Sequence, residues 1–189
     1  MKPLFGQNSD DLPAATRQAC APTRAPARFV LMGVAGCGKS SVGAALAAAL
    51  GAVYIDGDDL HSPENIAKMS KGTPLTDADR WPWLDAVGAA LAAPATIVGC
   101  SALRRAYRER IMQAAGAPVW FIHLMGSRAL IAQRMAARPN HFMPATLLDS
   151  QFATLEPPEA DEPAITVDID QPMPALVADI MAKLTQIRL

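Results

Sequence analysis

Residues 33–40 read Gly-Val-Ala-Gly-Cys-Gly-Lys-Ser and fit the pattern G-x-x-x-x-G-K-[ST] in full. The glycines permit the backbone angles that turn successive N–H groups inward, which makes a nest for an anion. The run 28–32 before the loop is apolar enough for a buried strand. The Ala-rich run 39–50 after it predicts a helix whose N-terminus points at the same anion. This order of strand, glycine-rich loop and helix predicts a loop that binds the phosphates of ATP.

We expect the residues of this loop to contact ATP through their backbone or side chains: Gly33, Val34, Ala35, Gly36, Cys37, Gly38, Lys39, Ser40 and Ser41. Lys39 can reach the β- and γ-phosphates, and Ser40 can ligate Mg²⁺. Cys37 has two interpretations. It is a small residue that contributes a backbone N–H, or it is a redox-sensitive thiol, because a helix N-terminus lowers the pKa of a thiol.

Strand and helix patterns alternate beyond the loop and indicate the fold class. Further strands are expected at 52–55, 96–98, 119–124 and 165–169. Further helices are expected at 63–69, 77–92, 103–115, 127–137 and 146–154, and from Pro172 onward. Five apolar strands that alternate with helices predict an α/β domain with three layers, in which helices cover both faces of a five-stranded parallel sheet. Ligands of such sheets bind beyond the carboxyl ends of the strands.

The first 27 residues differ from the rest, and we expect them to lie outside a domain that covers 28–189. They hold four prolines and show no sustained periodicity. One interpretation is a loosely ordered extension, because chain ends that are not tied down are usually mobile. The other is a targeting peptide, which Arg17, Arg24 and Arg28 favour and Asp10 and Asp11 oppose.

The composition is that of a globular protein with a small-molecule partner. Hydrophobic residues make up 51% and charged residues 19% of the chain, and the net charge is −1. A basic excess of the kind that nucleic acids or anionic membranes attract is absent. Three widely spaced cysteines indicate neither a zinc site nor a disulfide framework and fit a reducing cytoplasm. No apolar run approaches the ~20 residues needed to cross a bilayer.

An acidic turn, Asp56-Gly-Asp58, comes directly after the second expected strand. Two carboxylates beside a triphosphate can take two different roles in phosphoryl transfer. One can bind water on Mg²⁺, and the other can take the proton of a substrate hydroxyl or orient it. The alternative is an ordinary Asp-Gly turn with solvated carboxylates. His61 follows the turn and, taken alone, is typical of a surface or capping histidine.

Ser101 follows the third expected strand and is succeeded by the paired arginines Arg104 and Arg105. This group can bind an anionic or hydroxylated ligand, or it is a solvated helix start. Arg108 adds a third basic residue, and basic residues in a first helical turn oppose the helix dipole, which favours the binding function.

Arg134, Arg138 and His141 bracket a polar stretch after the fourth expected strand. Phosphoryl transfer needs cations that close over the developing charge, and a lid that carries arginines supplies them. We therefore predict a lid at about 134–147. The alternative is a basic surface helix.

Together these segments resemble the small P-loop gluconate kinases, or gluconokinases. The resemblance covers nearly all of 28–187. It rests on GVAGCGKSSVG (33–43), YIDGDDLHSPENIAKMSKGTPLTDADRWPWL (54–84), CSALRRAYRE (100–109), RPNHFMPATLLDSQFATLEPP (138–158) and VDIDQP (167–172). The second and fourth segments are the specific ones, since related shikimate and nucleotide kinases share the phosphate loop without them.

The resemblance implies ATP-dependent phosphorylation of D-gluconate at its 6-hydroxyl, a P-loop fold like that of nucleoside monophosphate kinases, Mg²⁺ and a homodimer. It makes Lys39, Asp58 and Arg138 catalytic, with Asp58 as the base. It assigns Arg134 to ATP and Ser40 and Asp56 to the metal. It implies a gluconate site formed by Asp58, His61, Arg80, Ser101, Arg104 and His141. Either Arg80 or Arg104 suits the carboxylate, and the segment 168–172 falls near the adenine.

Two departures from the family pattern touch the site. Gly99 stands where a larger apolar residue is usual, which we expect to widen the floor of the pocket slightly. Pro139 and Asn140 change the spacing residues of the lid.

Two other functions compete with a gluconate kinase. A shikimate-kinase-like enzyme is expected to carry a Gly-Gly-Gly run after the third strand, where this chain has Gly99-Cys100-Ser101. A non-catalytic nucleotide-binding module is expected to have lost Lys39 or Asp58, and both are present. A GTPase switch would need an Asn-Lys-x-Asp motif, which this chain lacks.

Overall fold

The computed structural model describes residues 28–137 and 145–187, so the expected N-terminal extension at 1–27 lies outside the described residues. The strands are β1 (Arg28–Met32), β2 (Val53–Asp56), β3 (Thr96–Gly99), β4 (Trp120–Met125) and β5 (Ala164–Asp168). The helices are α1 (Lys39–Leu50), the 3-10 helix η1 (Gly57–Leu60), α2 (Pro63–Ser70), α3 (Asp77–Ala90), α4 (Arg105–Ala115), α5 (Arg128–Ala136), α6 (Ala145–Thr154) and α7 (Met173–Gln186).

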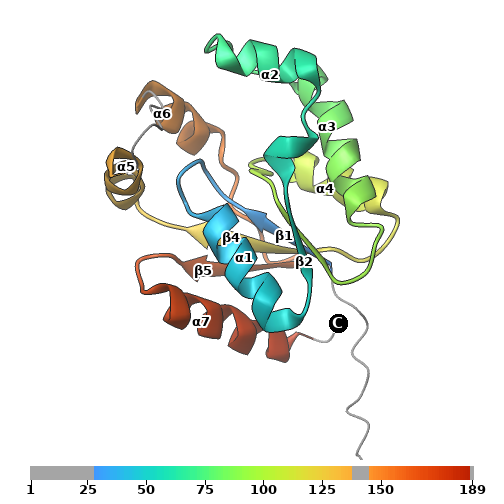
Figure 1. Ribbon diagram of the computed structural model, residues 1–189, viewed down its shortest axis with the longest axis vertical. Coiled ribbons are helices and arrows are strands. Elements are labelled where there is room, and N and C mark those ends of the chain that lie inside the picture. Colours follow the sequence, from blue (N-terminus) through green and yellow to red (C-terminus); the bar gives the residue numbers. More distant parts are fainter. Residues whose placement is uncertain (1–27, 138–144, 188–189) are drawn as a thin grey trace, which may run out of the picture.

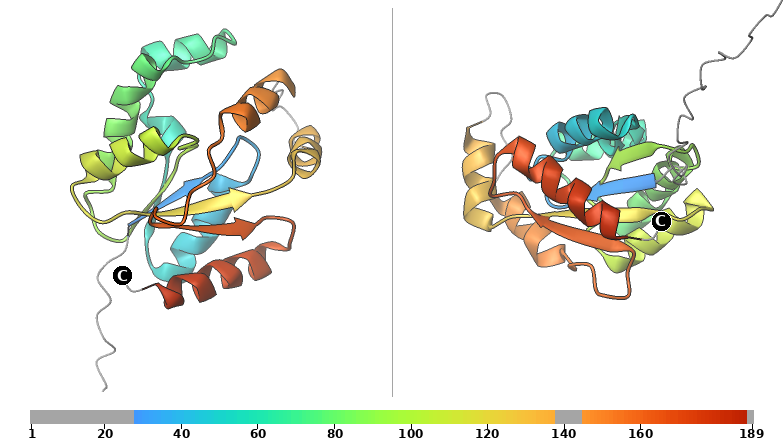
Figure 2. Two further views of the ribbon diagram at one scale, coloured as in Figure 1. Left: turned by 180° about the vertical axis from the view of Figure 1, so that it is seen from behind. Right: turned by 90° about the horizontal axis from the view of Figure 1, so that it is seen from below.

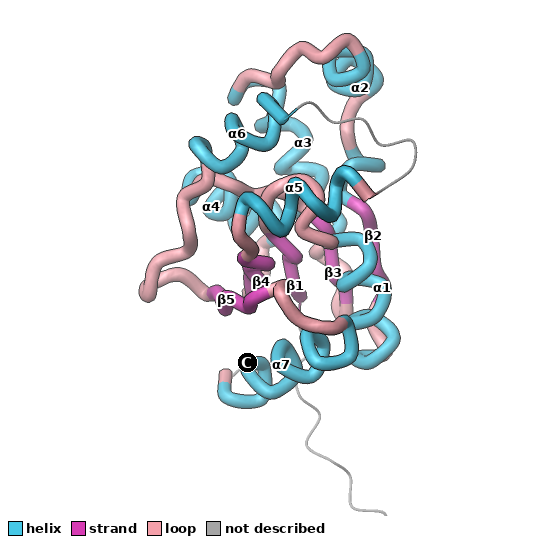
Figure 3. The backbone as a smooth tube through the Cα atoms, turned by 90° about the vertical axis from the view of Figure 1, so that its left-hand side faces the viewer, coloured by secondary structure: helices cyan, strands magenta, loops and turns pink. Residues whose placement is uncertain are grey.

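The strands form one parallel sheet in the order β2-β3-β1-β4-β5, which confirms the predicted five-stranded α/β fold. Figure 3 shows this order across the sheet. Near the carboxyl end of β1, Leu31 pairs with Gly99 of β3 on one side and Ile122 of β4 on the other. Asp56, the last residue of β2, also pairs with Gly99. The register therefore brings the loops that follow β1, β2 and β3 to one edge of the sheet.

Helices cover both faces of the sheet, which gives the three predicted layers (Figures 1 and 2). Phe29 and Leu31 of β1 pack into a core with α1, α5 and α7. Val30 and Met32 point the other way and pack into a second core with α3 and α4. The period of two in side-chain direction thus makes Phe29, Val30, Leu31 and Met32 all core residues, two on each face of the sheet.

Local signals explain where the helices begin and end. Gly51 ends α1 and Gly116 ends α4, each in the left-handed conformation that glycine adopts without steric cost. Thr76 begins α3 with a capping box in which its side chain and that of Asp79 bond each other's backbone N–H groups. The helix expected from 103 begins at Arg105 instead, because Ala102 has a φ of +43° and turns the chain before it becomes helical. Within the described residues, no helix is both long and apolar enough to cross a membrane.

Helices α3 and α4 pack closely because of Gly88. A Cβ atom added at Gly88 would lie 2.4 Å from the Cβ of Ala114 and 2.7 Å from the carbonyl oxygen of Ile111. Both atoms belong to α4, so the glycine sets the distance between the two helices.

We predict that Gly88→Ala destabilises the protein by about 1–3 kcal/mol, the usual cost of overpacking a core. Helix propensity alone predicts the opposite sign, since alanine is favoured over glycine by about 1 kcal/mol inside a helix. Urea unfolding measures the difference. A variant that is more stable than the parent would show that α3 and α4 are not in tight contact at this position.

Candidate active site

The loop 33–40 has the backbone that its glycines were expected to provide. Gly33, Gly36 and Gly38 have φ values of +142°, +80° and +98°. The space at Gly36 is also closed to a side chain, because an added Cβ would lie 2.5 Å from Cγ of Met135. The ammonium of Lys39 donates to the carbonyl oxygens of Gly33 (3.1 Å) and Val34 (3.2 Å), so its charge is held at the loop.

Cys37 is fully buried inside the loop. Burial raises the pKa of its thiol, although the nearby charge of Lys39 acts in the opposite direction. A buried, protonated thiol reacts poorly with oxidants, because the thiolate is the reactive form. Burial therefore outweighs the helix N-terminus, and the redox interpretation of Cys37 is wrong.

Ser40 and Asp56 lie together at the edge of the sheet. The Ser40 hydroxyl donates to Oδ2 of Asp56 at 2.8 Å, and Oδ1 of Asp56 accepts the backbone N–H of Asp58 at 3.1 Å. The Tyr54 hydroxyl lies 3.5 Å from the same Oδ2, and burial raises the pKa of Tyr54 to about 12. A hydroxyl and a carboxylate oxygen side by side fit Mg²⁺, which takes few protein ligands and completes its shell with water and phosphate.

The acidic turn is fixed by its backbone, which leaves its side chains free to reach a ligand. An added Cβ at Gly57 would lie 2.3 Å from the carbonyl oxygen of Gly99, so only glycine allows η1 to approach β3 this closely. The indole N–H of Trp83 donates to the carbonyl oxygen of Gly57 at 2.7 Å. Asp58 and Asp59 are exposed. Asp58 can therefore meet a substrate hydroxyl without moving the turn.

His61 lies beside the acidic turn, stacked on Trp83 with ring centroids 4.2 Å apart. Burial lowers the pKa of His61, and the charges of Asp58 and Arg80 act on it in opposite directions, raising and lowering it. Its Nδ1 is buried and has no hydrogen-bond partner among the described residues. Burial thus disfavours the charged form of His61, whose ring feels the charges of both predicted acceptor-binding residues, Asp58 and Arg80.

Arg80 of α3 and Arg104, which precedes α4, converge on one carboxylate. Asp77 accepts from Nη1 of Arg104 at 3.0 Å and lies 3.6 Å from Nη1 of Arg80. The guanidinium carbons of both arginines lie 5.7 Å from the ring centroid of Tyr107. Two cations that share one anion retain a net positive charge, which suits an anionic ligand.

The loop after β3 is tied to the phosphate loop. The backbone N–H of Gly33 donates to the carbonyl oxygen of Ser101 at 3.2 Å, so this predicted residue lies beside the nucleotide loop. Gly99 does not widen the pocket floor as expected. An added Cβ at Gly99 would lie 2.3 Å from the hydroxyl of Tyr54, so the glycine makes room for the tyrosine that contacts Asp56.

The predicted lid is described only in part. Nη2 of Arg134 on α5 donates to the carbonyl oxygen of Ile169 at 2.6 Å, which links it to the segment 168–172. Arg138 and His141, the other predicted lid residues, lie outside the described residues.

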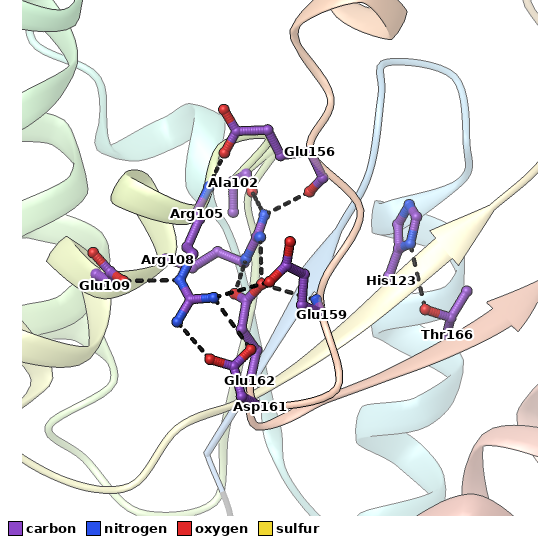
Figure 4. A network of polar contacts seen from close by, with 10 residues as sticks. All are labelled: Ala102, Arg105, Arg108, Glu109, His123, Glu156, Glu159, Asp161, Glu162 and Thr166. Atoms are coloured by element: carbon purple, nitrogen blue, oxygen red, sulfur yellow. Dashed lines mark hydrogen bonds and ion pairs between the residues drawn. The ribbon is translucent and has the colours of Figure 1, made fainter.

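Arg105 is not directed at the site. It bonds Asp161 and Glu159 in the loop before β5 and Glu109 in its own helix, and its backbone N–H donates to Glu156 (Figure 4). Its expected role in ligand binding is therefore wrong. The acidic loop 156–162 offsets the basic residues at the start of α4, which explains why they are tolerated there.

Gln151 of α6 was not predicted to be part of the site. Its Oε1 accepts the backbone N–H of Ala35 at 2.6 Å, across 116 residues of sequence. The only sequence signal was its position within the specific segment 138–158, which does not say what a glutamine would contact. The contact places α6 against the phosphate loop.

Comparisons with known proteins find relatives over most of the chain. A family model described as an AAA domain matches residues 29–158. A gluconokinase of Gluconobacter oxydans is 47% identical over 147 residues, which cover 75% of this chain and 82% of that protein. The crystal structure of a gluconokinase from Sinorhizobium meliloti superposes with a TM-score of 0.81 at 48% identity, covering 86% of this chain and 94% of that one.

A more distant structure shares the fold alone. The shikimate kinase of Aquifex aeolicus superposes with a TM-score of 0.54 at 15% identity, covering 84% of this chain and 96% of that one.

We predict that Gln151→Glu weakens ATP binding by at least roughly tenfold, or about 1.4 kcal/mol. A carboxylate accepts the Ala35 N–H more strongly than an amide oxygen does and adds a negative charge beside the phosphates. Isothermal titration with ATP measures the effect. Gln113→Glu on the exposed surface of α4 makes the same charge change and should leave the affinity unaltered. Equal affinities in the two variants would mean that Gln151 does not adjoin the nucleotide.

Proposed function

Because this chain belongs to the gluconokinase family, we propose that it transfers the γ-phosphoryl group of ATP to the 6-hydroxyl of D-gluconate, giving 6-phospho-D-gluconate and ADP. The observation that carries the proposal is the meeting of three groups at one sheet edge. These are a phosphate loop, a pair of carboxylates and a pair of arginines that share one counterion.

The nucleotide half of the site rests on the loop 33–41 and α1. The backbone N–H groups of the loop cradle the phosphates, and Lys39 exchanges its two carbonyl partners for the β- and γ-phosphates. Ser40 and Asp56 are the residues that would hold Mg²⁺, which would neutralise charge on the phosphates when bound. Arg134 contacts ATP from α5, beside the segment 168–172.

The acceptor half lies between the acidic turn and the arginines. Gluconate is a monoanion with a hydroxyl at the far end of its carbon chain. Arg80 or Arg104 binds the carboxylate, exchanging Asp77 for the ligand. His61 and Ser101 bond the hydroxyls between the two ends, and we assign His141 to the same role.

The transfer needs one proton acceptor and several cations. Asp58 accepts the proton of the 6-hydroxyl while the oxygen of that hydroxyl forms a bond to the γ-phosphorus. The bond from the γ-phosphorus to the β–γ bridging oxygen breaks at the same time, which releases ADP. Lys39 stabilises the charge that spreads over the transferred group, and we assign Arg138 to the same task. The resemblance also leads us to propose that the protein is a homodimer and is located in the cytoplasm. We propose that it binds the small sugar acid and neither nucleic acid nor a membrane.

The decisive assay is coupled ADP release with a panel of acceptors: gluconate, idonate, shikimate and nucleoside monophosphates. We expect gluconate to give the highest kcat/KM. If shikimate or a nucleotide gives a signal while gluconate gives none, the assignment of gluconate is wrong although the phosphoryl transfer stands.

Asp58→Asn should lower kcat by about 10²–10⁴-fold, the usual contribution of general base catalysis. The affinity for ATP should stay unchanged, because within 28–137 and 145–187 no hydrogen bond or ion pair joins the Asp58 side chain to the phosphate loop, Ser40 or Asp56. Asp59→Asn removes the neighbouring exposed carboxylate and serves as the matched control, with activity near that of the parent. Full activity in Asp58→Asn would remove its assignment as the base.

A further inference from the structure

A charged pair is buried behind the site. Arg108 of α4 is 0% exposed and makes two bonds to Glu162, of 2.5 and 2.8 Å (Figure 4). Its Nη1 also donates to the carbonyl oxygens of Ala102 (3.2 Å) and Glu156 (3.0 Å). Glu162 accepts the backbone N–H of Glu159 as well, at 3.0 Å. The hydrogen bonds from Arg108 lower the pKa of Glu162, which favours its carboxylate form.

This guanidinium is connected to the acceptor site by one carbonyl. Ala102 has a φ of +43°, which is unfavourable for a residue with a Cβ atom, and it is fully buried. It lies between Ser101 and Leu103, in the loop that ends at Arg104. The carbonyl of Leu103 accepts the backbone N–H of Glu156 at 2.8 Å, so the segment after α6 holds the same loop from behind.

We propose that the Arg108–Glu162 pair positions the acceptor loop 100–104. It holds Ala102 in the left-handed conformation and thereby sets where Ser101 and Arg104 meet the sugar acid. Arg108 and Glu162 are positioning residues, since neither reaches the ligand. The inference rests on the proposed function, because it takes Ser101 and Arg104 to be acceptor contacts.

The energetics of buried ion pairs favour positioning over stabilisation. Desolvation of two charges offsets most of their attraction, so an apolar pair of similar volume is often equally stable. An apolar pair cannot, however, donate to the carbonyl of Ala102. The phosphate loop is joined to the acceptor loop by the bond from the Gly33 N–H to the Ser101 carbonyl, but its own glycine torsions and α1 set its shape, so it depends less on this pair.

The test replaces both charges at once, with Arg108→Met/Glu162→Met, so that no buried charge is left without a partner. We expect KM for gluconate to rise roughly tenfold or more, the scale of effect that a small displacement of binding groups produces. The dissociation constant of ATP, measured without acceptor, should change by less than about twofold. If both constants shift equally, or KM for gluconate does not change, the proposal fails.

The same helix supplies a matched control. Arg110 makes two bonds to Asp85 of α3, of 2.6 and 2.7 Å, in an exposed pair that does not involve the acceptor loop. Arg110→Met/Asp85→Met should leave KM for gluconate and the affinity for ATP unaltered. A rise in KM for gluconate as large as that in the buried double variant would overturn the proposal.

A third substitution separates positioning from stability. Ala102→Gly removes the steric cost of the positive φ, so it should restore part of the affinity for gluconate when added to Arg108→Met/Glu162→Met. If the pair only stabilised the fold, Ala102→Gly would not restore the affinity. A failure of Ala102→Gly to restore any affinity for gluconate would therefore overturn the proposal. If the double variant does not fold, Arg108→Lys serves in its place. Lysine keeps the positive charge but lacks the planar set of donors that a guanidinium has, so this variant should still raise KM for gluconate and leave the affinity for ATP unchanged. A lower melting temperature with unchanged KM in Arg108→Lys would contradict the proposal.

The assay with several acceptors makes it possible to distinguish a failure of the positioning proposal from a failure of the proposed function. If the parent protein phosphorylates a different sugar acid, KM for that acid replaces KM for gluconate in every comparison, and the positioning proposal is tested all the same.

Discussion

The placement of β1 at the centre of the parallel sheet is the constraint on which the rest of the structure depends. Its neighbours β3 and β4 and the next strand, β2, all run the same way, so the loops after β1, β2 and β3 open at one edge. The bond between Gly33 and Ser101 and the bond between Ser40 and Asp56 both follow from that arrangement. Strand pairing thus brings together residues that are far apart in sequence, Gly33 with Ser101 and Ser40 with Asp56.

The charged groups of the site are held by partners inside the protein. Lys39 rests on loop carbonyls, Asp56 on Ser40 and a backbone N–H, and Arg80 and Arg104 on Asp77. Lys39, Asp56, Arg80 and Arg104 are thus oriented without a ligand, and in the proposed complex Lys39 and one of the two arginines would exchange these partners for groups of the ligands. Such preorganisation reduces the entropy that binding costs.

The sequence was sufficient for features that depend on local patterns. The phosphate loop and the five strands follow from glycine spacing and apolar runs. Contacts across the fold could not be predicted in this way. Gln151 meets Ala35, Gly99 admits the ring of Tyr54, and Arg105 turns to an acidic loop because of packing between segments more than 40 residues apart. The choice between the two interpretations of Cys37 depended on the burial of its side chain. The sequence shows where Cys37 lies in the loop but not how exposed it is.

A crystal structure with Mg²⁺, a non-hydrolysable ATP analogue and gluconate tests the assignment of the acceptor site most directly. We predict that the 6-hydroxyl lies about 2.6–3.2 Å from a carboxylate oxygen of Asp58, the range in which a base can take a proton. We also predict that the gluconate carboxylate meets Arg80 or Arg104 in place of Asp77. Gluconate bound with its 6-hydroxyl away from Asp58, or with its carboxylate away from both arginines, would contradict the proposed arrangement.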